Sequence, residues 1–139
     1  MKLSGRPVAL GLLVLLIGVY ADGQKNRKGL PGYDAATEFT FDATIEQVNN
    51  HRCGKNWSGT HLMVTLEGRP HKIHLGPAVF IKEQAILFRP GDRVTVTGSR
   101  IPADEGHGIV AREVRKGEQR LVLRDQDGRP SWSAQRWQW

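Results

Sequence analysis

Apolar and polar residues alternate in several short runs along the chain. In the first run, Phe39, Phe41, Ala43 and Ile45 alternate with threonine, aspartate and glutamate. A period of two is typical of a strand that buries one face. Further runs with this pattern cover residues 61–67, 72–75, 93–100, 108–114 and 119–125. The pattern therefore predicts six strands.

One helix is predicted between the third and fourth strands. Pro77 stands where proline is best tolerated, in a first helical turn, and Val79, Phe80, Gln84 and Leu87 follow at helical spacings. The order β-β-β-α-β-β is the connectivity of the OB-fold, a five-stranded Greek-key barrel. A β-sandwich has little use for this helix, and an SH3-like barrel places it elsewhere. We therefore predict an all-β fold with one short helix, an OB-fold-like barrel with an additional C-terminal strand.

The N-terminal pattern indicates export. Lys2 and Arg6 precede an apolar run over residues 8–19, and Val19 and Ala21 supply small residues at the two positions that a signal peptidase inspects before a cut after Ala21. The run is shorter than the roughly 20 residues that cross a bilayer as a helix, which disfavours an uncleaved anchor. The expected organisation is a signal peptide over residues 1–21, a flexible leader over 22–37, the barrel over 38–128 and a Trp/Arg-rich tail over 129–139. The expected location is the periplasm or the extracellular space.

Composition narrows the expected partners. The chain has 139 residues, a formal net charge of +6 and one cysteine. Its basic residues are spread out rather than gathered in one block, so the charge is a weak signal. Because nucleic acid is scarce outside the cytoplasm, the charge is expected to serve solubility or contact with acidic proteins, small anions or lipid head groups. The common nucleophile, zinc-protease, P-loop and dinucleotide motifs are missing from the sequence. We therefore expect a monomeric protein that is not an enzyme.

A loop predicted over residues 49–59 holds the sharpest candidate for chemistry. His51 and Cys53 lie two residues apart, and His61 begins the following strand. A thiolate with two imidazoles is a soft ligand set that suits Cu or Zn. The alternative is a loop with a buried thiol and solvated imidazoles, because the paired spacing of a zinc finger is missing. The expectation is no cofactor, with Cu or Zn at His51, Cys53 and His61 as the alternative.

Lys72 and His74 lie on the polar face of the third predicted strand. Exposed there, they are candidate ligand-binding residues. A four-residue hairpin loop over 68–71 sets His74 opposite Thr65, roughly 13 Å from His61, and keeps the loop proline out of the ladder. A two-residue loop would set His74 opposite Met63 and bring the histidines closer. The first register is favoured, so His74 is expected to be a surface residue rather than a metal ligand.

Two other histidines, His71 and His107, fall in predicted turns and carry no functional signal. Two carboxylate pairs, Asp104 with Glu105 and Asp125 with Asp127, also fall in turns. Acidic residues are common in turns because of turn geometry alone. No catalytic role is indicated for these residues.

The C-terminal tail combines tryptophan with arginine. Trp132, Trp137 and Trp139 lie near Arg129 and Arg136. Such a set can stack on bases or sugars, insert at a membrane interface or pack on the barrel. Trp132 lies close to the last strand and is expected to pack on the barrel, where it is also a candidate ligand-binding residue. For the last two tryptophans, contact with an anionic membrane surface is the expected role.

Five segments carry a family resemblance: "HRCGKNWSGTHL", "IHLGPAVFI", "GDRVTVTGSR", "AREV" and "LRDQDGRPSW". In this order they resemble small exported bacterial proteins with an OB-like domain, similar to the magnetosome-associated domain of the MamS/MamX type. The resemblance covers residues 39–132 and implies an exported barrel of largely uncharacterised role, and it supplies no enzymatic activity to carry over. Because the chain has no Cys-x-x-Cys-His motif, the haem modules linked to some magnetosome proteins are not expected here.

These observations support two main functional hypotheses. The first is an exported, non-enzymatic OB-like binding module for a protein or a small anionic ligand. The alternative is a periplasmic metal-binding or redox accessory protein that uses the His/Cys loop. Binding of single-stranded nucleic acid has only the fold in its favour, because few aromatic residues lie on the strands.

Overall fold

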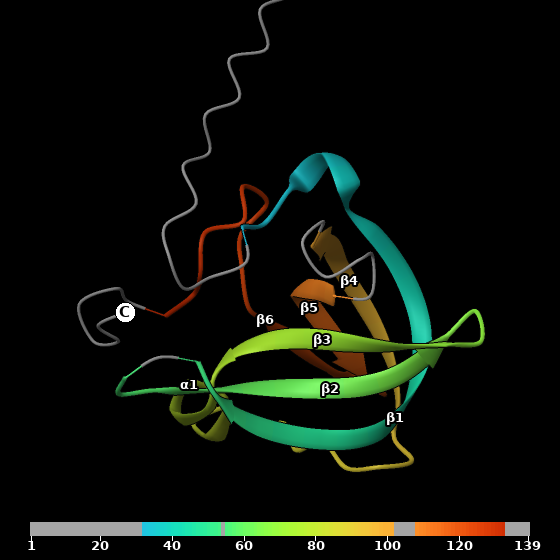
Figure 1. Cartoon of the computed structure of the whole chain (residues 1–139), viewed down its shortest axis with the longest axis horizontal. Helices are drawn as coiled ribbons and strands as arrows, with labels where there is room; N and C mark the ends of the chain where they lie inside the picture. Colours follow the sequence, from blue (N-terminus) through green and yellow to red (C-terminus); the bar gives the residue numbers. More distant parts are fainter. Residues whose placement is uncertain (1–31, 54, 102–107, 133–139) are drawn as a thin grey trace, which may run out of the picture.

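The computed structural model describes residues 32–53, 55–101 and 108–132. The predicted signal peptide, most of the leader, His107, Trp137 and Trp139 lie outside the described residues. The elements are η1 (Ala35–Thr37), β1 (Phe39–Arg52), β2 (Ser58–Leu66), β3 (Arg69–Pro77), α1 (Ala78–Lys82), β4 (Arg93–Ile101), β5 (Gly108–Lys116) and β6 (Gln119–Val122). Figure 1 shows the strands wrapped into a barrel, with α1 beside one end of β2 and β3. The described helices include none with the length and apolar composition to cross a bilayer.

Five strands close the barrel. β1 pairs antiparallel with β2 and β4, and β2 pairs with β3 and β4 with β5 in the same sense. The closure is parallel and joins residues 72–74 of β3 to residues 108–110 of β5. The later part of β5, residues 113–116, pairs instead with β6, which lies outside the closed ring. The predicted OB-fold-like barrel with one additional strand is confirmed.

The core follows from the alternation in the sequence. Leu62 and Val64 on β2 and Ile73 and Leu75 on β3 are fully buried, as expected for the inward face of a barrel strand. Burying an aliphatic side chain of this size stabilises the fold by about 1.5–3 kcal/mol. Ile81 of α1 adds to the same cluster and covers one end of the barrel. The residues on the outward positions between them are then available for other roles.

The helix is shorter than predicted. α1 has five residues, and Pro77, expected inside its first turn, is the last residue of β3. Beyond α1 the chain alternates again: Ile86 and Phe88 are buried, whereas Leu87 is 59% exposed. A continued helix could not turn both Ile86 and Phe88 inward, since residues two apart do not face the same side of a helix. Packing at the end of the barrel therefore overrides the helical spacing.

The register predicted for the β2–β3 hairpin is wrong. The turn is Glu67–Gly68, and both residues have positive φ, 52° and 74°. Two such residues form the tight turn that matches the right-handed twist of paired strands. Pro70 stays in the ladder opposite Thr65, and the pairing brings His61 opposite His74. Both registers considered from the sequence had set His74 further along β2.

Two predicted boundaries also shift. β1 continues to Arg52 and β2 begins at Ser58, so the loop expected over residues 49–59 is reduced to residues 53–57. His51 therefore lies on a strand and pairs with Gly59. His71, expected in a turn, lies on β3, where it is buried and its Nδ1 lies 3.0 Å from the carbonyl oxygen of Arg69. Strand pairing holds these residues in place more firmly than a loop would.

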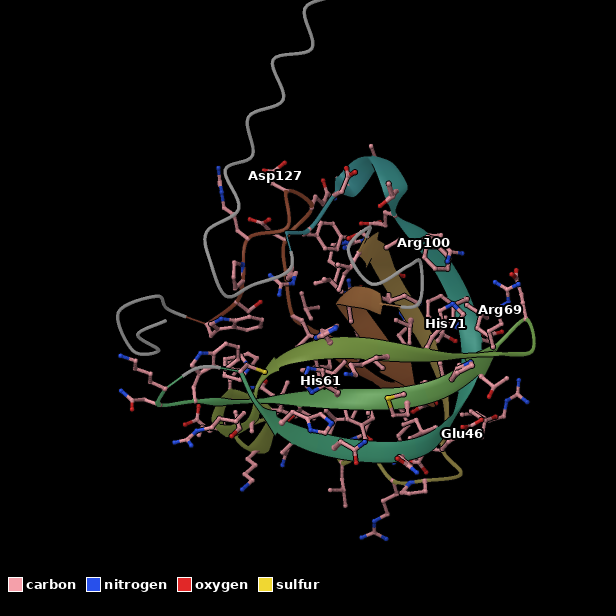
Figure 2. All side chains as sticks on the ribbon, viewed as in Figure 1. Glu46, His61, Arg69, His71, Arg100 and Asp127 are labelled. Carbon is pink, nitrogen blue, oxygen red and sulfur yellow. The ribbon has the colours of Figure 1, made fainter. Side chains whose placement is uncertain are left out.

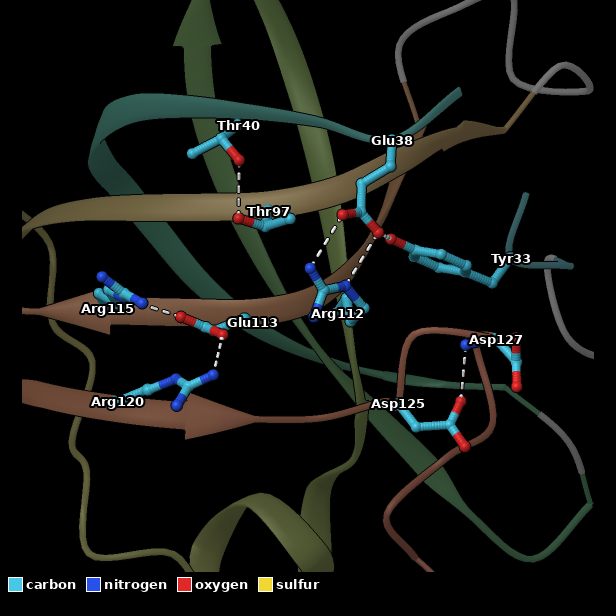
Figure 3. A network of polar contacts seen from close by, with 10 residues as sticks. All are labelled: Tyr33, Glu38, Thr40, Thr97, Arg112, Glu113, Arg115, Arg120, Asp125 and Asp127. Carbon is cyan, nitrogen blue, oxygen red and sulfur yellow. Dashed lines mark hydrogen bonds and ion pairs between the residues drawn. The ribbon is translucent and has the colours of Figure 1, made fainter. Parts of the chain in front are cut away.

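Polar contacts join the start of β1 to β5, as Figure 3 shows. Arg112 donates two hydrogen bonds to Glu38, each 2.8 Å long, and the Tyr33 hydroxyl donates to the same carboxylate. This arrangement lowers the pKa of Glu38, chiefly through Arg112, while burial and then Glu38 raise the pKa of Tyr33 to about 12. These three residues form a paired network that fastens the segment before β1 to the barrel.

Candidate functional site

Three histidines meet on the outer face of three neighbouring strands. His51 lies on β1, His61 on β2 and His74 on β3. The ring centroids of His51 and His61 are 5.3 Å apart, and those of His61 and His74 are 4.5 Å apart in an edge-to-face contact. Figure 2 shows His61 well away from the hairpin end, near which Arg69 and His71 lie. His74, expected to be remote from His61, is thus its direct neighbour.

Gly59 creates the space in which the fourth predicted residue, Cys53, approaches this cluster. A β-carbon on Gly59 would lie 2.9 Å from the Cys53 Sγ, 3.3 Å from the His61 Cε1 and 3.4 Å from the Trp57 ring. Real β-carbons do not approach a sulfur so closely. The glycine is thus required for the close approach of its neighbours. We call Cys53, Trp57, Gly59 and His61, with His51 across the strand pair, the Gly59 cradle.

A tight turn brings the thiol into this cradle. The backbone N–H of Cys53 donates to the carbonyl of Trp57 over 3.1 Å, which closes the loop between β1 and β2. The Cys53 thiol lies 3.3 Å from the carbonyl oxygen of His51, to which it donates. Cys53 is half-buried and Trp57 is half-buried beside it. The thiol therefore lies at the rim of the cradle rather than in the barrel core.

His61 is the buried centre of the cluster. His61 is only 4% exposed, and its Nδ1 has no hydrogen-bond partner among the described residues. Burial lowers the pKa of His61 to about 4. Electrostatic interactions with His74, His51 and Lys72 lower this pKa further, and a backbone contribution from Gly59 opposes them. The ring is therefore neutral at pH 7. Lys72, half-buried on β3, belongs to the electrostatic surroundings of His61.

The rings of the cluster pack against each other. Within residues 32–53, 55–101 and 108–132, no three His, Cys, Asp or Glu side chains are arranged to hold a metal ion as they stand. His51 is exposed, so its ring can change rotamer without disturbing the core. The structure thus brings the predicted ligands His51, Cys53 and His61 together without setting them in a three-ligand geometry.

A second feature, which the sequence did not reveal, is a hollow of about 580 Å³ beside α1. Its cations come from three elements: Arg52 at the end of β1, Lys55 in the following loop and Lys82 at the end of α1. Its remaining lining residues are Asn50, Asn56, Trp57, Ser58, Pro77, Ala78 and Val79. We call this hollow the basic groove. Arg52 and Lys55 are close in the sequence, but Lys82 follows Lys55 by 27 residues, so no local pattern predicts the full set.

The charge of the basic groove is one-sided. No aspartate or glutamate is among the described residues that line it, and none of its three cations forms an ion pair with a described residue. The Arg52 guanidinium donates to the backbone carbonyl of Lys55 over 3.1 Å, which holds the Arg52 side chain against the loop. An adjoining hollow of about 330 Å³ shares Lys82 and is otherwise largely apolar. Cationic and apolar surfaces therefore adjoin along one side of α1.

Trp132 is buried against the barrel. Its ring lies 5.3 Å from the ring of Phe80, and a β-carbon on Gly76 would lie 2.7 Å from it. The Arg124 guanidinium stands 5.0 Å from the ring centroid in a cation–π contact, and burial lowers the pKa of Arg124 to about 10. With so little exposed surface, Trp132 has a packing role here. Its role in ligand binding, like those of Lys72 and His74, stays a prediction.

Comparison with known proteins places the chain in a family. The profile of the MamS/MamX magnetosome protein family matches residues 37–121, from the last residue of η1 into β6. No curated protein and no solved structure gives a significant match. The matched region includes every strand of the barrel, the Gly59 cradle and the basic groove. The chain therefore belongs to the MamS/MamX magnetosome protein family.

Proposed function

We propose that this chain is an exported, non-enzymatic binding module that holds an anionic ligand in the basic groove. The observation that carries the proposal is the set of Arg52, Lys55 and Lys82 in one groove without a carboxylate among the described lining residues. All three cations are exposed, and gathered on one concave surface they create a local positive potential that attracts anions. An acidic ligand would neutralise this charge and relieve the repulsion between the cations.

The other walls of the groove narrow the chemistry of the ligand. Val79 is 54% exposed beside Pro77 and Ala78, and the Trp57 ring lines the loop side. Apolar and aromatic surface next to cations suits a ligand that carries a carboxylate or phosphate beside an apolar group. An acidic segment of another envelope protein has this chemistry, and so does a small amphipathic anion. The family's description names magnetosomes, so a partner in a magnetosome-associated setting is the first to be sought.

The groove can be tested with a labelled peptide of alternating glutamate and leucine. Fluorescence anisotropy would measure its affinity at low and moderate salt for the wild-type protein and for the double variant Arg52→Glu, Lys82→Glu. We expect the double variant to bind at least about tenfold more weakly, since like charges now oppose the ligand. Arg69→Glu is a control, because Arg69 is exposed at the hairpin, outside the groove.

Three outcomes would contradict the proposal. Equal loss in Arg69→Glu would show a response to net charge rather than to the groove. No loss in the double variant would place binding elsewhere on the surface. Tighter binding of a single-stranded oligonucleotide or of anionic vesicles than of the peptide would identify a different class of ligand, and vesicle binding would point to the tail.

A further inference from the structure

We propose that the Gly59 cradle binds monovalent copper, with Cys53 Sγ and one nitrogen of His61 as ligands and His51 as a third. This site goes beyond the proposed function, because none of its ligands is a cation of the basic groove. Cu(I) is a soft ion that thiolate and imidazole ligands select. His51 pairs with Gly59 across β1 and β2, and His61 follows Gly59 by two residues on β2. Cys53 is held near them by its backbone hydrogen bond to Trp57.

The cradle satisfies the first geometric requirement, which is a shared space for the two main donors. The Cys53 Sγ and the His61 Cε1, the carbon bonded to both ring nitrogens, lie within 3.3 Å of the same point above Gly59. Only the missing β-carbon leaves this point open. His51 pairs directly with Gly59 across the strands, so its side chain starts beside the same space.

His61 supplies a second, independent observation. It is more than nine-tenths buried, and its Nδ1 has no partner among the described residues, which is costly for a polar atom in a protein interior. The unpartnered nitrogen of the buried His61 ring can bind an ion without losing a protein contact. The packed ring of His74 further restricts its rotation.

The number of ligands favours copper over zinc. A structural zinc ion requires four ligands in a tetrahedron. Cu(I) has a filled d shell and accepts two or three soft ligands, so Cys53 and His61 alone can hold it. Rotation of the Cys53 thiol and of the exposed His51 side chain is enough to complete the site. On binding, the thiol proton passes to solvent and no electron is transferred, since the ion enters and remains as Cu(I).

Anaerobic competition against a chromophoric Cu(I) chelator would test the site with the full-length purified protein. We expect one Cu(I) per chain, with quenching of tryptophan fluorescence because Trp57 borders the cradle. Cys53→Ser should weaken binding on the order of 100-fold and His61→Gln at least about tenfold, as each removes a ligand. His71→Gln is the matched control, because His71 is also buried on β3 but lies near the hairpin.

A second variant keeps all the ligands and removes only the space. In Gly59→Ala, the new β-carbon would stand 2.9 Å from the Cys53 Sγ, so the thiol has to move away. We expect a loss of at least about tenfold in Cu(I) affinity, with circular dichroism confirming that each variant is folded. Lys82→Glu, which changes the basic groove, should leave Cu(I) affinity unchanged and thus separates this site from the proposed function.

Several results would overturn the proposal. Equal Cu(I) affinity in the wild type and Cys53→Ser would exclude the thiol as a ligand. Unchanged affinity in both His61→Gln and Gly59→Ala would reduce the site to an isolated cysteine. Zn²⁺ binding as tight as Cu(I) binding would contradict the assignment to a soft monovalent ion.

Discussion

Two regions of the barrel treat charge in opposite ways. Around β5, charged groups are paired: Arg112 binds Glu38, and Glu113 accepts hydrogen bonds from Arg115 and Arg120. Along α1, the three cations of the basic groove lie beside one another without a described acidic partner. Figures 1 and 3 place α1 and the Arg112 network on different parts of the molecule.

The difference follows from what each region does in the fold. The Arg112 network lies where the segment before β1 crosses β5, so its pairs hold together residues 74 positions apart in the chain. Paired, partly buried charges with good geometry contribute to stability. The groove cations hold no such long-range contact, and their electrostatic free energy is available to a ligand. Paired charge here maintains the fold, and unpaired charge is the basis of the proposed binding surface.

The largest expected effect is on stability, from Arg112→Met. This change removes two charge-assisted hydrogen bonds and leaves Glu38 with only Tyr33 as a neighbour in the network. We expect a loss of about 1–3 kcal/mol in the free energy of unfolding, measured by urea denaturation at pH 7. The matched change Arg52→Met in the groove serves as the control. Equal losses in the two variants would remove the distinction between the regions.

The second expected effect is smaller and concerns how stability changes with pH, which tests the contact between Arg112 and Glu38 directly. The pKa of Glu38 in the folded protein lies below its ordinary value of 4.5, so its contribution is present above that pH and is lost as the pH falls through the folded pKa. The wild type should therefore lose melting temperature more steeply below pH 4.5 than Arg112→Met does. Histidine protonation is common to both proteins and cancels in the comparison. Parallel profiles would show that Arg112 does not set the acid response of Glu38.

Alternation along the strands was enough to predict the barrel. Whether a strand residue faces inward can be inferred from the alternation of apolar and polar residues around it, as Leu62 and Val64 on β2 show. The hairpin register could not be predicted in the same way. It depends on Glu67 adopting a positive φ, which a glutamate rarely does, so a turn was not expected at this position.

The candidate sites divide along the same line. His51, Cys53 and His61 were identified together because they are close in the sequence, but His74 was set apart because its neighbourhood depends on the register. The role of Gly59 lies in the three side chains that converge on it, which no spacing rule contains. The basic groove was missed for a related reason, since the end of β1, a loop and α1 form it jointly.

The smallest expected change in stability comes from the groove itself. Lys82→Met removes an exposed cation at the end of α1 that forms no ion pair with a described residue. Surface substitutions of this kind change the free energy of unfolding by no more than about 0.5 kcal/mol. Removing like charge from the groove relieves repulsion, so a slight gain in stability fits the same argument.

If the groove is a binding surface, this variant should nevertheless bind the acidic peptide several-fold more weakly. Urea denaturation and fluorescence anisotropy on the same preparation separate the two effects. A drop in stability as large as that of Arg112→Met would show that Lys82 maintains the fold, and its charge would then not be spare for a ligand.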